Sequence, residues 1–254
     1  MRVIVTRPAT QAAEWVEHLR RAAIDAVALP LIGIAPPADP AAVASAWEAL
    51  ARQRLVVFVS PNAAEQFFAQ RPPGAPWPPG SIAGSPGPGT TRTLLRLGVP
   101  ALAIAEPAAD AAQFDSESLW AALCQREWRG VAVLIVRGDG GRDWLARTLA
   151  DVGAAVTHLA AYARVAPALD AAATVLLCAA LAEPAAHLWF FSSSEAIDNL
   201  AALPQARAAD WPAAMAIATH PRIAERARSL GFGRVLEARP APAAVVACLQ
   251  SAPS

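Results

Sequence analysis

Two patterns of hydrophobic residues alternate along the 254-residue chain. Short apolar runs of strand length are followed by turn residues, and then by segments with the period of an amphipathic helix. The pattern predicts strands at Val3–Val5, Leu55–Val59, Ile82–Ala83, Ala101–Ala105, Val131–Val136, Ala155–Leu159, Leu188–Phe191, Met215–Ala218 and Arg234–Glu237. It predicts helices at Gln11–Ala23, Asn62–Gln70, Thr91–Leu97, Ser118–Glu127, Trp144–Val152, Ser194–Leu203, Arg222–Leu230 and Pro242–Gln250. This alternation is typical of an α/β protein whose parallel sheets are covered by helices on both faces.

Glycine and proline mark the ends of several of these helices. Gly98, Gly153 and Gly231 each follow a predicted helix by one residue, where a left-handed residue ends the helix. Pro61 and Pro221 lie in predicted first turns, where the N–H that proline lacks would have no intrahelical acceptor.

An internal repeat and two proline-bearing segments predict two lobes. Residues 58–63 resemble residues 190–196, because each segment ends a buried strand in serine and opens a helix. Downstream, residues 81–98 and 215–231 repeat the same order of strand, turn and helix. The chain changes character near residues 30–37 and 162–167. We therefore expect one lobe from residues 1–34 plus 165–254 and a second lobe from residues 37–161.

Composition and charge exclude several classes of protein. With 55% hydrophobic and 17% charged residues, the chain has enough apolar side chains for a large core and is not disordered. The 21 basic residues balance the 21 acidic ones and form no cluster, so no nucleic-acid partner is expected. No apolar run approaches the ~20 residues of a membrane span, and residues 1–8 lack the apolar stretch of a signal peptide. We expect a cytoplasmic protein without a membrane partner.

The chain contains no lysine, so all its basic residues are arginine. This absence excludes a Schiff-base lysine, attachment of pyridoxal phosphate and a P-loop lysine. Cys124, Cys178 and Cys248 are far apart, and the four histidines are scattered. We therefore expect neither a disulfide framework nor a metal site.

The turns after the predicted strands share one composition. They lie at residues 6–8, 60–62, 85–91, 137–142, 192–194 and 219–221. Hydroxyls, glycines and arginines dominate them, without carboxylate pairs or Ser–His and Cys–His combinations. This composition favours the binding of anions by backbone amides, helix N-termini and guanidinium groups. The glycine-rich turn at 137–142 matches neither GxGxxG nor a P-loop, which argues against a nucleotide site.

Each turn also fits a purely structural role. Ser192, with Glu195 three residues later, fits a capping box, and Ser60 fits an ordinary N-cap. Arg137 fits an arginine paired with a nearby acid, and residues 87–91 fit a tight loop. Tyr162 is the only tyrosine and lies where the chain is expected to cross between lobes. It fits either a packed interface residue or a hydrogen-bond donor to a departing oxygen.

Taken in order, segments from nearly the whole chain resemble uroporphyrinogen-III synthases. These segments are Val5-Thr6-Arg7-Pro8, Leu29-Pro30-Leu31-Ile32, Phe58-Val59-Ser60-Pro61-Asn62-Ala63, residues 84–98, Asp115-Ser116-Glu117-Ser118-Leu119, residues 134–145, residues 153–162, Phe191-Ser192-Ser193 and residues 219–231. The chain departs from the family pattern at Val59 and Phe191, where threonine is frequent, and at Ala218, where glycine is common.

The resemblance implies two similar parallel-sheet α/β lobes, flavodoxin-like, joined by a short two-stranded connection, with the active site in the cleft. It implies a lyase (hydro-lyase) of tetrapyrrole and haem biosynthesis that needs no metal or organic cofactor. The enzyme would dehydrate and cyclise hydroxymethylbilane, a linear tetrapyrrole polycarboxylate, to uroporphyrinogen III with inversion of the terminal pyrrole. No long apolar stripe remains once the helices cover the sheets, so a monomer is expected.

The implied chemistry depends on positioning, because this substrate also cyclises by itself to the wrong isomer. Tyr162 is the expected catalytic residue, as the hydrogen-bond donor to the departing hydroxyl. The expected substrate-binding residues are Arg7, Ser60, Asn62, Thr90, Thr91, Arg137, Gly138, Arg142, Ser192, Ser193 and Thr219.

Two other functions use a similar arrangement of turns. One is a non-catalytic, two-lobed module that binds or senses a small anion. Such a module usually has an attached output domain or a signal peptide, for which the predicted elements leave no room. The other is a nucleotide-dependent transferase, which the missing lysine and the missing carboxylate cluster for Mg²⁺ disfavour.

Overall fold

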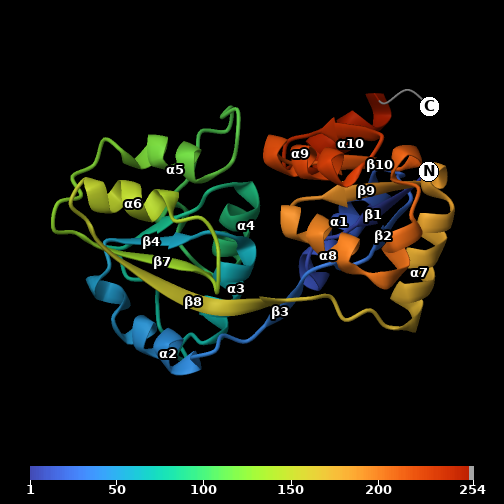
Figure 1. The fold of residues 1–254 in the computed structure, drawn as a ribbon. Coiled ribbons are helices and arrows are strands. Elements are labelled where there is room, and N and C mark those ends of the chain that lie inside the picture. Colours follow the sequence, from blue (N-terminus) through green and yellow to red (C-terminus); the bar gives the residue numbers. More distant parts are fainter. Residues whose placement is uncertain (252–254) are drawn as a thin grey trace. The chain divides into compact units, whose positions relative to one another are not determined.

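The computed structural model describes residues 1–251, which form two compact units (Figure 1). Unit 1 consists of Met1–Gly33 and the chain from Val165 onward, and unit 2 consists of Ile34–Arg164. Each unit is built on its own sheet, with helices connecting successive parallel strands. The α/β class with parallel sheets predicted from the sequence is confirmed.

The sheet of unit 1 has five strands, all parallel. Its order is β11-β10-β9-β1-β2. The strands are β1 (Arg2–Val5), β2 (Ala26–Ala28), β9 (His187–Phe191), β10 (Met215–Ala218) and β11 (Arg234–Glu237). Every residue of the central strand β9 is buried, as expected for a parallel strand covered on both faces.

Five helices belong to unit 1, namely α1 (Ala9–Arg21), α7 (Ala171–Ala182), α8 (Ser194–Ala202), α9 (Pro221–Leu230) and α10 (Pro242–Ser251). Short 3-10 helices at Pro184–Ala186, Pro204–Ala208 and Trp211–Ala213 connect some of the elements. On one sheet face, α1 and α10 pack against Val5 and Phe190. The Trp15 ring of α1 lies 4.6 Å from the ring of Phe190, centroid to centroid. Helices α8 and α9 pack against β9 and β10 and bury apolar side chains of these strands.

The sheet of unit 2 has six strands in the order β3-β8-β7-β4-β5-β6. They are β3 (Gly33–Ala35), β4 (Leu55–Phe58), β5 (Ile82–Gly84), β6 (Ile104–Ala105), β7 (Ala132–Gly138) and β8 (Ala155–Val165). The strands from β8 to β6 pair in parallel. Strand β3 and the end of β8, which are neighbours in this sheet, contain the two points where the chain passes from one unit to the other.

Alternate residues of β4 and β7 face two separate cores in unit 2. Val56 and Phe58 join a core with α2 (Pro40–Glu48), α3 (Pro61–Ala69) and α4 (Pro88–Arg96). Leu55 and Val57 join a second core with α5 (Ser116–Leu123) and α6 (Trp144–Asp151). Because successive side chains of a strand point to opposite faces, the same strands contribute to the cores on both faces of this sheet. Short 3-10 helices at Leu50–Arg52 and Ala101–Ala103 also belong to the unit.

The two sheets share one spatial order although the chain enters them at different strands. Written from the opposite edge, the parallel part of the unit 2 sheet is β6-β5-β4-β7-β8, which corresponds to β11-β10-β9-β1-β2 of unit 1. Strands β4 and β5 thus correspond to β9 and β10. These are the strands of the sequence repeat, so the repeat marks equivalent central strands of the two sheets.

Several helix ends agree with the sequence signals. Gly98, Gly153 and Gly231 have φ angles of 90°, 91° and 112°, in the left-handed region that glycine favours. Pro61 and Pro221 are the first residues of α3 and α9. These predictions are confirmed.

Other elements differ from the sequence pattern. Strands β2 and β3 and helices α2 and α7 were not predicted, because they are short or rich in alanine and show little apolar periodicity. The strand expected at Ala101–Ala105 is wrong for its first part, since residues 101–103 form a 3-10 turn after Pro100. Strand β8 continues to Val165, well beyond the expected end at Leu159. This extension places Tyr162 inside the sheet.

Within residues 1–251, no helix combines the length and the apolar character needed to span a membrane. In the same residues no group of three or more His, Cys, Asp or Glu is placed to hold a metal ion. Cys124, Cys178 and Cys248 are free thiols.

A backbone carbonyl lies so close to Gly233 that a side chain at this position should lower stability. A Cβ on Gly233 would lie 1.9 Å from the carbonyl oxygen of Pro212, and a backbone atom cannot rotate away. We expect Gly233→Ala to lower the free energy of unfolding by about 2 kcal/mol or more, measured by urea denaturation. Gly80→Ala is the matched control, because nothing lies within 4 Å of its Cβ position. Equal stability of the two variants would contradict the prediction.

Candidate functional site

The expected site residues gather at the carboxyl edge of the sheet in each unit. In unit 1, the turns after β1, β9 and β10 hold Arg7, Ser192, Ser193 and Thr219. In unit 2, the turns and first helical turns after β4 and β5 hold Ser60, Asn62, Thr90 and Thr91, the ends of β7 and β8 hold Arg137, Gly138 and Tyr162, and the loop after β7 holds Arg142. Because parallel strands end at the same edge of a sheet, residues far apart in sequence are brought close together in each group.

In unit 2, the hydroxyl of Tyr162 contacts the residue that caps a helix. Ser60 is the N-cap of α3, and its Oγ accepts a hydrogen bond from the backbone N–H of Ala63 at 3.2 Å. The same Oγ lies 3.2 Å from Oη of Tyr162, which is 102 positions later in the chain. The Tyr162 side chain is fully buried among the core residues of this unit. The expected catalytic residue is therefore held by packing, with its polar end at the N-terminus of α3.

Gly138 provides the space for the ring of Tyr162. The two residues are paired across β7 and β8, next to a register shift between Arg137 and Gly138. A Cβ on residue 138 would lie 3.0 Å from Cζ of Tyr162 and 3.4 Å from its Oη. The structure thus places the tyrosine ring against Gly138, a residue expected from the sequence to bind substrate.

Arg137 is bonded within its own loop. Its Nη2 donates to the carbonyl oxygen of Gly141 at 2.9 Å, its Nε donates to that of Gly140 at 3.3 Å, and its Nη1 donates to the carboxylate of Asp143. Only 14% of the side chain is exposed. The hydrogen bond and the charge of Arg137 lower the pKa of the Asp143 carboxyl. The paired arrangement of Arg137, one of the two alternatives from the sequence, is the one present in the structure.

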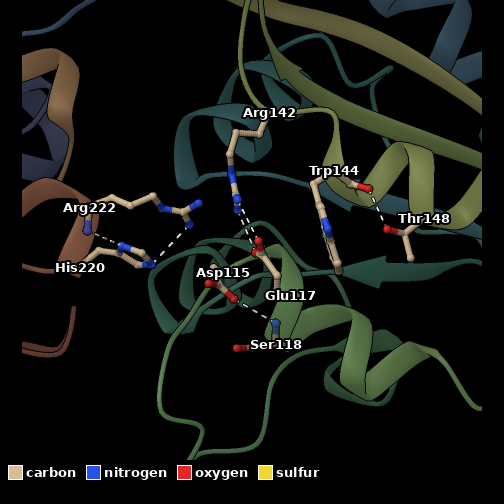
Figure 2. A network of polar contacts seen from close by, with 8 residues as sticks. All are labelled: Asp115, Glu117, Ser118, Arg142, Trp144, Thr148, His220 and Arg222. Atoms are coloured by element: carbon tan, nitrogen blue, oxygen red, sulfur yellow. Dashed lines mark hydrogen bonds and ion pairs between the residues drawn. The ribbon is translucent and has the colours of Figure 1, made fainter.

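Arg142 makes a two-point ion pair with Glu117. Its Nη1 and Nη2 donate to Oε1 and Oε2 of Glu117, both at 2.8 Å, and Figure 2 shows the two parallel bonds. The hydrogen bond to Glu117 raises the pKa of Arg142. Glu117 lies in the first turn of α5, which Asp115 caps through a bond from the Ser118 N–H. The two side chains are 44% and 40% exposed, so solvent and solutes reach this pair.

Thr90 and Thr91 lie in the first turn of α4 and are buried. Thr91 Oγ1 donates to the carboxylate of Glu106 at 2.6 Å and lies 2.9 Å from Oγ of Ser85. Asn62 is a half-buried residue of the first turn of α3. The Thr91 hydroxyl thus ties the N-terminal end of α4 to the residue that follows β6.

In unit 1, Arg7 lies over the indole of Trp15, with its Cζ 5.6 Å from the ring centroid. Its Nε and Nη2 both donate to Oε1 of Gln11, at 3.2 and 2.8 Å. The preceding Thr6 donates from Oγ1 to the carbonyl oxygen of Phe190 at 2.8 Å, which fixes the start of this turn against β9.

The cap of α8 is Ser193, and the capping box expected at Ser192 is wrong. Helix α8 begins at Ser194, one residue later than a cap at Ser192 requires, and Oγ of Ser193 accepts from the N–H of Glu195 at 3.2 Å. Ser192 lies just before the cap and is half-buried.

Thr219 is buried, and the next residue caps α9. Nδ1 of His220 accepts from the N–H of Arg222 at 3.1 Å, and Nη2 of Arg222 lies 3.4 Å from Nε2 of the same ring (Figure 2). This cap was not predicted, and its only sequence signal is a histidine just before Pro221, which opens the helix.

The partners of the two loop arginines and of Tyr162 were also missed. Neither the Arg142–Glu117 pair nor the Arg137–Asp143 pair has a sequence spacing that indicates an ion pair. Both pairs become visible only in the folded structure. Arg164, two residues after Tyr162, has its Nη2 3.5 Å from the tyrosine Oη. Its position on the extended β8 would have been the only signal.

Comparison with known proteins identifies one family. The family model for uroporphyrinogen-III synthase HemD matches residues 13–247. Among solved structures, a mutant uroporphyrinogen III synthase from Thermus thermophilus is 16% identical, with a TM-score of 0.56, over 98% of this chain and 96% of that one. The uroporphyrinogen-III synthetase from Helicobacter pylori is 15% identical, with a TM-score of 0.55, over 98% and 97% of the two chains. The structural matches support the fold, and the family match over nearly the whole chain shows that this protein belongs to the uroporphyrinogen-III synthase family.

Proposed function

We propose that Tyr162 donates a hydrogen bond to the hydroxyl that leaves hydroxymethylbilane as this chain cyclises it. The family is a family of enzymes that catalyse this cyclisation. The contact between Oη of Tyr162 and Oγ of Ser60 carries the proposal, because it holds the only phenol of the chain beside a helix N-terminus. A donor that packing holds in place stabilises a departing oxygen. The Tyr162 side chain is fully buried in this structure, so the proposal requires that substrate binding uncovers Oη.

The remaining polar groups fit the binding of a polycarboxylate. We assign the substrate carboxylates to Arg7, Asn62, Thr90, Arg142, Ser192, Ser193 and Thr219. The hydroxyls of Ser60 and Thr91 contact Tyr162 and Glu106, so we assign these two residues to holding the N-terminal ends of α3 and α4, and Arg137 and Gly138 to shaping the loop after β7. Helix N-termini and guanidinium groups both favour negative charge. Because the substrate is reactive by itself, holding its ends in the geometry of one isomer supplies most of the catalysis.

Arg142 is the stronger of the two loop arginines as a direct carboxylate contact. It already binds a carboxylate through two parallel bonds in an exposed position, and a substrate carboxylate has the same shape. The Arg137 guanidinium is largely covered, and two backbone carbonyls and Asp143 accept its bonds. We propose that Arg137 acts through the shape of the loop.

Three further expectations from the sequence remain proposals. The functional lobes are residues 1–34 with 165–254 and residues 37–161. The enzyme works as a monomer, without a nucleic-acid or membrane partner. Its location is the cytoplasm. Each rests on the sequence pattern described above.

The isomer of the product separates catalysis from mere binding. Incubated with hydroxymethylbilane, the protein should yield uroporphyrinogen III, which chromatography of the oxidised porphyrins identifies. A non-catalytic module that binds or senses anions would leave the spontaneous type I isomer at the rate of the protein-free control.

Removal of the Tyr162 hydroxyl should lower the rate without changing the fold. We expect Tyr162→Phe to reduce kcat for type III product about 100-fold, the lower end of the range for a positioned proton donor. The phenylalanine ring keeps the packing against Gly138, so the circular dichroism spectrum and the unfolding midpoint provide the folding control. Full rate and full type III yield in this variant would rule out the proposed role.

Removal of the Arg142 guanidinium should weaken substrate binding. A charge-assisted contact is worth about 1.5–3 kcal/mol, so Arg142→Gln should raise KM about tenfold or more. Arg96→Gln is the matched control, because it also breaks an Arg–Glu pair in unit 2, with Glu65, outside the six turns. If both variants have the KM of the wild type, Arg142 does not contact the substrate.

A further inference from the structure

We propose that Arg164 is a positioning residue for Tyr162, with which it shares strand β8. Together with Ser60, it donates hydrogen bonds to the phenolic oxygen and so leaves the phenolic hydrogen for the substrate. This inference rests on the proposed role of Tyr162 and adds a second residue to it.

The guanidinium of Arg164 lies at the hydroxyl end of the tyrosine ring. Its Nη2 is 3.5 Å from Oη of Tyr162, and its Cζ is 6.0 Å from the ring centroid. The backbone N–H of Arg164 donates to Oδ1 of Asp139 at 3.3 Å, which ties this end of β8 to the loop that follows β7. Arg164 is thus anchored through its backbone while its side chain reaches the hydroxyl.

The chemistry of arginine fixes the direction of this contact. A guanidinium has five N–H donors and no acceptor, so Arg164 donates and the tyrosine oxygen accepts. A phenol has one hydrogen to donate. Because Tyr162 is the acceptor in this contact, its own hydrogen is not used in it.

The capping geometry favours the same direction for Ser60. Its Oγ already accepts from the N–H of Ala63, with lone pairs toward the positive end of α3. The same positive end repels the hydroxyl hydrogen, so in the proposed arrangement this hydrogen points away from the helix and is donated to Oη of Tyr162, 3.2 Å away. With donors from Ser60 and Arg164 on its oxygen, Tyr162 has its own hydrogen available for a third group.

The hydrogen bonds to Oη of Tyr162 would act while the substrate loses water. As the C–O bond of the hydroxymethyl group breaks, both bonding electrons leave with the oxygen, and the pyrrole nitrogen supplies the pair that stabilises the exocyclic carbon. The phenolic proton passes to the departing oxygen, which leaves as water, and negative charge develops on Oη. The proton later released by the pyrrole carbon that closes the ring restores the phenol. The two hydrogen bonds and the charge of Arg164 stabilise the charge on Oη.

A role through Tyr162 differs in kinetics from a direct contact with substrate. Arg164→Gln should lower kcat for type III product about tenfold, because one donor to the developing charge is lost, with KM unchanged. In a Tyr162→Phe background the same substitution should have no further effect, since the oxygen that it serves is gone. Arg126→Gln, an exposed arginine of unit 2 outside the site, should match the wild type.

The outcomes separate this inference from the proposed function. Full activity of Tyr162→Phe contradicts the proposed function and the inference together. An impaired Tyr162→Phe with an unimpaired Arg164→Gln contradicts the inference alone. A rise in KM, or an equal loss of kcat in both backgrounds, shows that Arg164 contacts the substrate directly and also overturns the inference.

A measurement on the free protein tests the hydrogen-bond direction without any substrate. Tyr162 is the only tyrosine, so the tyrosine Fermi doublet in the ultraviolet resonance Raman spectrum reports this hydroxyl alone. We expect the intensity ratio of an accepting phenol in the wild type, and a shift away from it in Arg164→Gln and in Ser60→Ala. Ser60→Thr keeps a capping hydroxyl and should restore the ratio. A donor-type ratio in the wild type would overturn the inference.

Discussion

A strand can join its neighbours in parallel only if the chain returns to the same end of the sheet before each new strand begins. Helices make most of these returns, so the turns from strand to helix collect at the carboxyl edge. That edge receives the free N–H groups of helix N-termini, and the hydroxyls and arginines of the turns lie among them. The gathering of these polar groups therefore follows from the direction of the strands.

Local neighbours, more than exposure to solvent, determine what each polar group in unit 2 can do. The ring of Tyr162 is placed by the missing side chain at Gly138, and its oxygen lies beside a helix cap. Asp143 and two backbone carbonyls hold Arg137 inside its loop, whereas Glu117 holds Arg142 where solutes reach it. Two arginines five positions apart thus differ in their partners and in their exposure.

The sequence predicts the elements whose signals are local and misses those that depend on partners. Met215–Ala218 was located to the residue, because a buried parallel strand is a continuous apolar run. Arg234–Glu237 was also located to the residue, as the edge strand that follows Gly231 and Gly233. Helix α7 was missed because nearly all its residues are apolar or small, which leaves no contrast between its faces. The positions of the candidate turns follow from strand ends, but the partner of Arg137 depends on how its loop closes. Arg164 was missed because a single arginine on an unpredicted strand extension shows no pattern.

The insertion of unit 2 between β2 and β9 has a consequence for the nascent chain. Unit 2 is continuous from residue 34 to 164, so its sheet can be completed during synthesis as soon as these residues have emerged. Strand β1 pairs with β9, and no ribosome can supply that partner until residue 191 has been made. Val5 and its neighbours in β1 therefore lack the β9 side of their sheet until the inserted unit has been made. The sheet that the chain begins first is the one that it completes last.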